Sequence, residues 1–279
     1  MSGKFIVISQ RFMIVALLAI CFITTFAQES SSRKQTCTGD YEGDWNNYNN
    51  GRSYCEWQEQ TLPATGAVIQ VDGKQNGGLT IRGWTRQEIL VRAKVQGRGN
   101  NAQEARDTAA QVRIETAGLN IYAVGPESRD NRWWSVSFEI FVPQQSDLAL
   151  KTNNGGIGIF GIRGNLNFTA NNGGIILQDL AGNVQGRTNN GWLSIRLAGV
   201  GWEGKFLDVA TTNGDVTVSV PESYSAHLEA RTNRGSLTFA IPVTLPKPLE
   251  RSVITDLGNG GAPLRISTIN GSMTFKPRR

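Results

Sequence analysis

Apolar residues recur at fixed distances from six glycines in the second half of the chain. A Leu or Val lies seven residues before each glycine, and large apolar residues lie two and four residues after it. Because strand side chains alternate between two faces, this pattern predicts strands with one buried face. The six glycines are Gly155, Gly173, Gly191, Gly214, Gly235 and Gly271.

Polar residues follow the same repeat. Asn precedes five of the six glycines, and Thr lies three residues before five of them. Asn-Gly is typical of tight turns, because Gly adopts positive φ angles freely and Asn does so more readily than most residues. Each unit is therefore predicted to be a strand, an Asn-Gly turn with positive φ, and a second strand.

These units are too short to bury an apolar face alone, so we expect them to stack into a shared core. The spacing is 18 residues from Gly155 to Gly173 and again to Gly191. We expect an all-β fold, a single-stranded β-solenoid or β-helix-like repeat domain with one short helix. Identical Thr and Asn residues at equivalent positions favour this fold, because they form ladders only when successive units stack. The alternative is an antiparallel β-meander, in which each Asn-Gly closes a hairpin.

The region before the repeats contains weaker signals of the same kind. Segments 68–71, 79–81, 88–95 and 134–142 are predicted strands. Residues 101–112 form the one convincing helix, with Asn101 as its cap, Glu104 in its first turn, and Ala105 and Ala109 on one face. We expect this helix to cover one end or side of the β core.

The N-terminus has the features of a secretory signal. Lys4 and Arg11 precede an uncharged run at residues 12–26, and Ala27 and Gln28 flank a predicted cleavage site. The run is shorter than the ~20 residues of a spanning helix, although a retained anchor is the alternative. We therefore predict a signal peptide at 1–27, an exported protein in the periplasm or at the cell surface, and membrane contact only before cleavage.

Removal of the signal changes the charge and the cysteine count. The mature chain would carry 26 basic and 23 acidic residues, a net charge of 26 − 23 = +3. This charge is small and scattered, whereas nucleic-acid binding requires concentrated cations, so no nucleic-acid partner is expected. Two cysteines would remain, Cys37 and Cys55, and export predicts a disulfide between them. No metal or cofactor site is expected.

An aromatic segment surrounds this cysteine pair. It contains Tyr41, Trp45 and Tyr48 among Asp, Asn and Gly residues, with Trp57 just outside. These rings could stack on sugars, or they could pack as a cap over the open end of the repeats. We treat residues 28–65 as a disulfide-pinned N-terminal segment and residues 66–279 as the β-repeat domain.

Catalytic motifs are weak. The sequence GIGIFG at 156–161 matches a dinucleotide fingerprint, but no helix is predicted after it. Asp208, Asp215 and Glu229 are isolated acids, whereas glycoside hydrolysis needs a carboxylate pair. His227, the only histidine, follows Ser225-Ala226 on a predicted strand edge and is interpreted as a surface residue. We expect no enzymatic activity.

The order of these features is distinctive. A strand–Asn76-Gly77-Gly78–strand unit, an Ala-rich helix and Phe141-Val142-Pro143 precede the Thr-Asn-x-Gly repeats. A late LGNGG loop at 257–261 precedes the final unit. Over about residues 66–276 the chain resembles the bacterial family of exported β-repeat domains described as putative adhesins.

This resemblance implies an envelope location and a surface-interaction role without catalytic residues. The implied partner is a glycan or protein of the cell envelope or cell surface. The alternative function is that of a carbohydrate-binding or polysaccharide-active β-helix protein.

Overall fold

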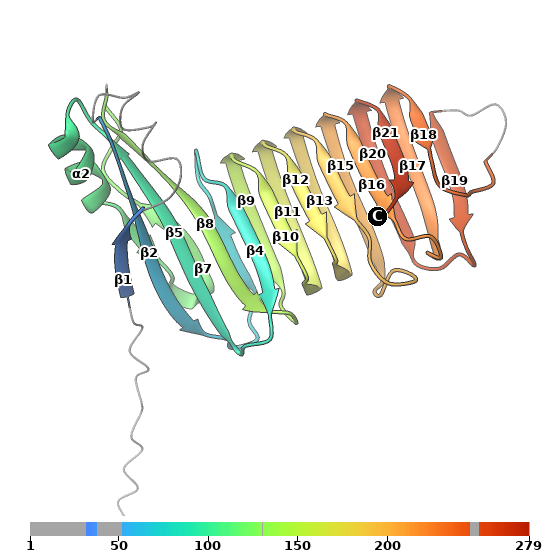
Figure 1. Ribbon diagram of the computed structural model, residues 1–279, viewed down its shortest axis with the longest axis horizontal. Helices are drawn as coiled ribbons and strands as arrows, with labels where there is room; N and C mark the ends of the chain where they lie inside the picture. The colour runs from blue at the N-terminus through green and yellow to red at the C-terminus, as the bar shows by residue number, and fades with distance from the viewer. Residues whose placement is uncertain (1–31, 38–51, 130, 246–250, 279) are drawn as a thin grey trace, which may run out of the picture.

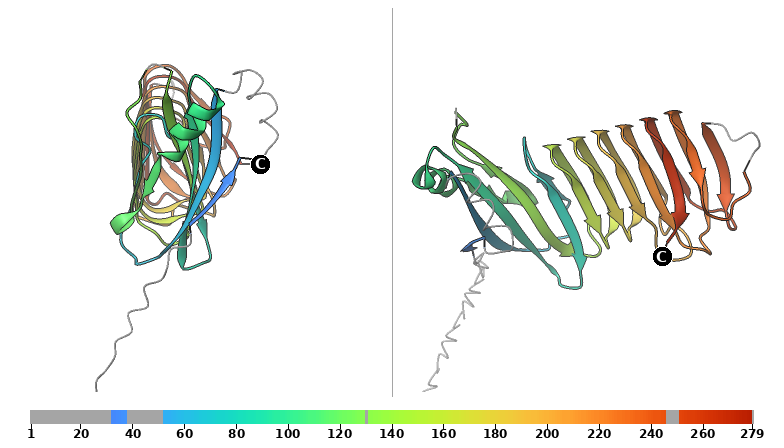
Figure 2. Two further views of the ribbon diagram at one scale, coloured as in Figure 1. Left: turned by 90° about the vertical axis from the view of Figure 1, so that its left-hand side faces the viewer. Right: turned by 45° about the horizontal axis from the view of Figure 1, so that its top comes forward.

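The protein forms two large, open β-sheets whose inner faces share one hydrophobic core. The computed structural model describes residues 32–37, 52–129, 131–245 and 251–278. Figure 1 shows the strands side by side along the long axis, from β1 and α2 at one end to β19 at the other. The end-on view in Figure 2 shows the two layers of this elongated fold. The all-β prediction is confirmed.

Sheet A contains 11 described strands, most of them short in the repeat region. In spatial order they are β1 (Ser32–Thr36), β2 (Ser53–Pro63), β5 (Glu88–Arg98), β8 (Trp133–Pro143), β4 (Leu79–Trp84), β10 (Ile157–Phe160), β12 (Ile175–Gln178), β14 (Leu193–Arg196), β16 (Val216–Val220), β21 (Met273–Pro277) and β18 (Leu237–Phe239).

Sheet B contains 10 described strands, and two helical segments complete this part of the chain. The strands in spatial order are β19 (Ser252–Leu257), β17 (Ala226–Arg234), β20 (Pro263–Asn270), β15 (Phe206–Asn213), β13 (Ala181–Asn190), β11 (Arg163–Asn172), β9 (Leu148–Asn154), β3 (Ile69–Asp72), β7 (Asn120–Val124) and β6 (Arg113–Glu115). The helices are α2 (Ala102–Ala110) and the 3₁₀ turn η1 (Ala117–Leu119).

Each repeat unit contributes one strand to each sheet. Equivalent strands of neighbouring units pair in parallel and in register, so that Leu166 lies opposite Leu148 and Val184. In sheet A, Ile175 likewise lies opposite Ile157 and Leu193. The antiparallel meander, our alternative prediction, is therefore wrong for the repeats, because Asn-Gly connects strands of different sheets rather than a hairpin.

The final unit does not occupy the last place in the stack. Strand β20 lies between β15 and β17, and β21 lies between β16 and β18. The chain therefore completes the unit of Gly235, turns back through the antiparallel strand β19, and inserts the unit of Gly271 between two earlier units. The sequence repeat does not predict this order, because it specifies only which residue types occur at each distance from the glycine within one unit.

Threonine hydroxyls join neighbouring units inside the fold. Thr211 Oγ1 donates to the Gly191 carbonyl oxygen at 2.7 Å, and the other four repeat threonines make the same bond with the preceding unit in the stack. All five threonines are at least 96% buried. Since a buried hydroxyl without a partner is costly, this column requires a neighbouring unit at the correct register.

Asparagine side chains form a second connection at the surface. Asn172 Nδ2 donates to Asn154 Oδ1 at 2.7 Å, and Asn190 Nδ2 donates to Asn172 Oδ1 at 2.8 Å. The same bond continues on both sides, from Asn76 to Asn270, through six units. We call this row the asparagine ladder.

The repeat glycines allow a close backbone approach. A Cβ atom at Gly191 would come closer than 3.0 Å to the carbonyl oxygen of Gly173, and the equivalent clash occurs at each of the other five repeat glycines. Our expectation that these glycines supply positive φ angles is wrong for five of the six, which are absent from the positive-φ residues. They are needed because stacking leaves no space for a side chain.

The repeat core faces inward as the pattern predicts. Leu166, Phe168, Leu177, Leu207 and Val218 are each at least 98% buried. The last predicted member, Phe239, is only half-buried because β18 is the edge strand of sheet A, where its ring stacks on Phe275 with centroids 4.6 Å apart.

The two ends of the core are covered differently. At one end, where Figure 1 labels α2, this helix packs on β2, β5 and β8, with Ala105 and Ala109 fully buried. Asn101 caps this helix by accepting a hydrogen bond from the Glu104 backbone N–H at 3.0 Å, so the predicted helix and its cap are confirmed. Toward the other end, Ile241, Val243 and Leu245 pack against the core.

Replacement of Gly191 by Ala tests the close approach. The added Cβ would meet backbone of the neighbouring unit, so we expect a loss of unfolding free energy of about 1–3 kcal/mol or more. The control is Gly78→Ala, where the nearest atoms lie 3.8 Å from the added Cβ. Urea unfolding of both variants measures the difference, and equal stability would contradict the stacking argument.

Candidate interaction surface

The predicted disulfide is present and joins the first two described strands. Cys37 and Cys55 are bonded, with Cα atoms 5.5 Å apart, and the Cys37 backbone N–H donates to the Cys55 carbonyl at 3.3 Å. The bond lies at the end of β1, where it meets β2, so it secures an edge strand of sheet A.

Most of the predicted aromatic site lies outside the described residues. Tyr41, Trp45 and Tyr48 fall there, as do Ala27 and Gln28 of the predicted cleavage site. Trp57 is described: it lies half-buried on β2, and the guanidinium of Arg92 is 4.9 Å from its ring centroid. Ligand stacking by these rings remains a prediction.

Trp57 belongs to a longer row on the outer face of sheet A. Arg92 also binds Glu139 at 2.7 Å, Glu139 binds Arg82 at 3.5 Å, and the Arg82 guanidinium lies 4.5 Å from the Phe160 ring centroid. These five residues come from five neighbouring strands, β2, β5, β8, β4 and β10. We call Trp57, Arg92, Glu139, Arg82 and Phe160 the arginine–aromatic belt.

The belt is a consequence of strand alternation. Arg92 lies between the buried residues Val91 and Ala93 of β5, and Glu139 lies between Phe138 and Ile140 of β8, so both side chains point outward. Four strand spacings of about 4.8 Å give the belt a length of roughly 19 Å. The alternating pattern shows that these residues face outward, but strand order decides which of them meet.

Further aromatic and cationic side chains flank the belt. Trp84 packs against Phe141 with ring centroids 5.4 Å apart, and the Arg86 guanidinium lies 5.0 Å from the Trp84 ring. Trp133, 39% exposed, lies under Arg98 at 5.9 Å. Cations over aromatic rings contribute about 0.5–1 kcal/mol each at exposed sites. Apart from Trp57, sequence analysis missed this face, because the belt residues come from five separate segments.

The candidate acids do not form a free pair. Asp208 on β15 binds Arg187 at 2.8 Å, and Glu229 on β17 binds Arg265 at 3.0 Å. Strand β20 separates them, with Arg265 opposite both. Asp215 accepts from the Ser272 backbone N–H at 2.8 Å near the Asn-Gly edge.

His227 pairs with an acid rather than with a serine. Its Nδ1 lies 2.7 Å from Asp256 Oδ1 on the antiparallel strand β19. The nearby Ser225 hydroxyl accepts a hydrogen bond from the Asn259 backbone N–H at 3.2 Å. The arrangement is an exposed His–Asp pair, and Ser225 is engaged elsewhere.

The glycine-rich motif at 156–161 lies on a strand. Its apolar residues form β10, and β11 begins at Arg163 without an intervening helix. A helix N-terminus is the part of a dinucleotide fingerprint that binds phosphate, so this motif lacks the required structure. Within the described ranges, no group of three or more His, Cys, Asp or Glu side chains could hold a metal ion.

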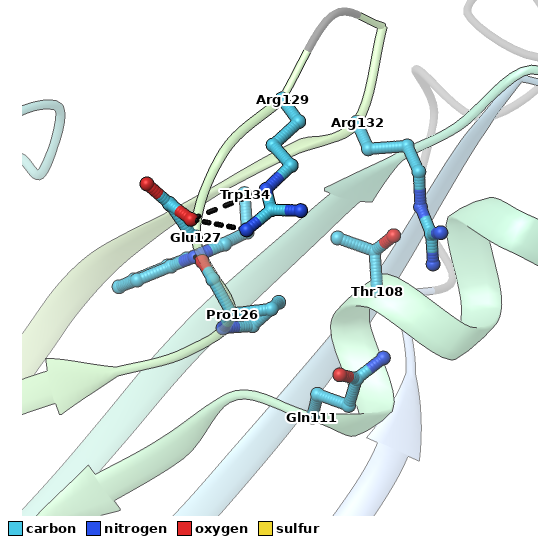
Figure 3. Close-up of a pocket in the computed structure, with 7 residues that line it drawn as sticks. All are labelled: Thr108, Gln111, Pro126, Glu127, Arg129, Arg132 and Trp134. Carbon is cyan, nitrogen blue, oxygen red and sulfur yellow. Dashed lines mark hydrogen bonds and ion pairs between the residues drawn. The ribbon is translucent and has the colours of Figure 1, made fainter.

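Two hollows in the described surface are lined by both polar and apolar residues. One of about 270 Å³ lies between α2 and the 125–133 loop (Figure 3). Figure 3 shows Arg129 paired with Glu127 above Trp134, with Thr108 and Gln111 on the helix side. A second hollow of about 220 Å³ includes Asp147, which accepts two hydrogen bonds from Asn165.

Two groups with shifted pKa values lie outside the belt. Hydrogen bonds from the Asn100 backbone N–H and side chain lower the pKa of Glu104. Burial raises the pKa of Tyr224, and the nearby negative charge of Glu203 adds to this effect. Both groups serve the fold, at the cap of α2 and in the core.

No helix among the residues that the structure describes has the length and apolar character needed to cross a membrane.

The sequence matches no family model and no curated protein. Solved structures that are similar to this chain include a putative cell adhesion protein from Clostridium sporogenes. It has 14% identity and a TM-score of 0.38, with 80% of this chain and 99% of that one covered. A putative adhesin from Parabacteroides distasonis has 10% identity and a TM-score of 0.26, and the match covers 78% of this chain and 96% of that one.

A third similar structure is a putative lipid binding protein from Parabacteroides distasonis. It has 10% identity and a TM-score of 0.29, and the match covers 79% of this chain and 96% of that one. Two of these three structures are described as putative adhesion proteins. With identities and TM-scores this low, no residue role is transferred to this chain.

Loss of the disulfide should weaken the N-terminal edge. Replacing Cys37 and Cys55 with Ser should lower the unfolding free energy by about 3 kcal/mol, because the unfolded chain loses a constraint. Denaturant unfolding measures this change, and non-reducing peptide mass mapping establishes the bond in the native protein. Two free thiols in exported material would contradict the prediction.

Tyr224 should make the protein sensitive to alkali. Its pKa is raised above the unfolded value of about 10, so the folded state retains a proton that the unfolded state loses. The contribution of Tyr224 to the unfolding free energy should therefore be fully present below pH ~10, and the unfolding free energy should fall above that pH. Urea unfolding at neutral and alkaline pH should show a smaller decrease for Tyr224→Phe, and an equal decrease would contradict this assignment.

Proposed function

We propose that this protein is an exported, non-enzymatic component of the cell envelope that acts by presenting its β-repeat surface to another molecule. The observation that carries the proposal is the arginine–aromatic belt. Its rings, guanidinium groups and the Glu139 carboxylate lie outward on five adjacent strands, where the core does not require them. Aromatic residues and arginine are the side chains most enriched where proteins bind partners.

The repeat region would act as a β-solenoid in this proposal. Successive units pair in parallel in both sheets, and each Asn-Gly step passes from sheet B to sheet A. A stack of this kind presents the same outward position at about 4.8 Å intervals, which suits an extended partner.

Export is supported by the disulfide. Disulfides persist in oxidising compartments such as the periplasm and the cell surface, and are rare in the cytosol. The predicted signal peptide agrees with that location. We therefore propose a periplasmic or surface-exposed protein whose partner is a glycan or protein of the envelope.

Charge disfavours nucleic acid as the partner. The belt arginines Arg92 and Arg82 are already bound to Glu59 and Glu139, so they do not form an unpaired cationic stripe. Nucleic-acid binding depends on cations that are free to contact phosphates.

The alternative is a carbohydrate-binding or polysaccharide-active protein. Binding is the better supported form of it, since Asp208 and Glu229 are each held by an arginine and are separated by β20. A glycosidase would need two carboxylates positioned about one scissile bond.

Retention on native envelope fractions tests the proposed role. The chain 28–279 should be retained saturably, and Arg82→Ala combined with Phe160→Ala should weaken retention at least about tenfold, as for an interface hot spot. The matched control is Asn167→Ala with Gln185→Ala, two paired exposed residues on the outer face of sheet B. Equal losses from both pairs, or no retention of the unchanged protein, would contradict the proposal.

A separate experiment tests whether the protein hydrolyses envelope polysaccharide. Incubation with the same envelope fraction should release no soluble sugar, with or without Asp208→Asn, Asp215→Asn and Glu229→Gln. Sugar release by the unchanged protein that these substitutions abolish would instead establish a hydrolase.

A further inference from the structure

Trp192 presents a flat aromatic ring at the Asn-Gly edge of the repeats. It is 49% exposed, and it lies between Gly191 and the first residue of β14. The ring packs over Gly174 of the neighbouring unit, because a Cβ there would come closer than 3.0 Å to three atoms of the indole. One side of the ring is thus supported by backbone, and a large part of the remainder is open to solvent.

The fold does not require an aromatic residue in this place. The equivalent positions of the other units are occupied by Gly156, Gly174, Asp215, Ser236 and Ser272, all of them small or polar. Trp192 lies on the outward side of sheet A, since the next residue, Leu193, is buried. An exposed ring that contributes little to the core is available for a ligand.

Hydrogen-bonding groups lie next to the ring. Asn190 is two residues before Trp192, and Asn172 is two residues before Gly174, so each pair of Cα atoms is at most about 7 Å apart. In the asparagine ladder each amide uses one N–H to reach the preceding unit. An amide has two N–H donors and two acceptor lone pairs, so hydrogen-bonding capacity remains for a ligand.

Charge restricts the ligand class. On the other side of Trp192 the next unit carries Asp215, whose Oδ1 accepts from the Ser272 backbone N–H. This carboxylate would repel an acidic ligand, while its remaining acceptor capacity suits a hydroxyl group. The asparagine ladder itself is uncharged.

We propose that Trp192 is the stacking platform of a binding site for an uncharged glycan. The C–H face of one pyranose ring would pack on the indole, and its hydroxyl groups would bond to the amides of Asn172 and Asn190 and to Asp215. This site is separate from the belt. The proposal specifies a ligand class for the surface-interaction role and therefore rests on that proposed function.

Calorimetric titration of the chain 28–279 tests the site. The probes are cellohexaose, chitohexaose and mannohexaose, with an oligogalacturonate of similar length as the acidic counterpart. At least one neutral hexaose should bind, and the acidic oligomer should bind at least about tenfold more weakly. Trp192→Ala should weaken binding about tenfold or more, and Trp192→Phe should retain part of it, as expected when a stacked ring is removed or reduced.

Trp133→Ala is the matched control, because Trp133 is also an exposed tryptophan on sheet A, at 39%, but its strand β8 is separated from β14 by β4, β10 and β12. It should leave the affinity unchanged, whereas Asn190→Ala should weaken it severalfold. Thermal unfolding should show that Trp192→Ala remains folded. The proposal is overturned if no neutral hexaose binds, if the acidic oligomer binds more tightly, or if Trp133→Ala has the same effect as Trp192→Ala.

Envelope retention separates this inference from the proposed function. If the unchanged protein is retained on envelope fractions but binds no hexaose, the surface role stands and the glycan site does not. If neither binding is observed, both fail.

Discussion

The fold depends on how closely neighbouring repeat units approach at the Asn-Gly step. A carbonyl oxygen of one unit lies where a side chain of the next would begin, so only glycine fits there. In five units the same step is secured by a buried threonine hydroxyl that donates to a glycine carbonyl. Steric exclusion and the need to satisfy a buried polar group therefore act together, and both fix the register of one unit on the next.

This constraint determines which surfaces remain for function. Inward side chains are committed to the core, and the Asn-Gly edge is partly committed to the asparagine ladder. Chemical variety is left mainly to the outward faces of the two sheets. Sheet A carries the belt and Trp192, whereas the outer face of sheet B carries amides and ion pairs such as Arg187–Asp208. The two faces therefore suit ligands of different chemistry.

Open sheets must also protect their edges and ends. The disulfide joins β1 to β2 at one edge of sheet A, and α2 covers the core beside it. At the far end β19 pairs antiparallel with β17, while Ile241, Val243 and Leu245 cover apolar core residues. These features oppose edge-to-edge association, which exposed strands otherwise favour.

The sequence by itself determined the local features of this protein. Alternation and the Thr, Asn and Gly columns identified the strands and their inward residues, and capping residues identified the helix, because each depends on neighbours close in the chain. The cysteine pair was predictable since only two cysteines remain after the signal. The tertiary structure alone decided the insertion of the Gly271 unit, the meeting of Trp57, Arg92, Glu139, Arg82 and Phe160, and the true role of the repeat glycines. These depend on which strands lie side by side, and contacts between segments far apart in the chain leave no periodic signal within any one of them.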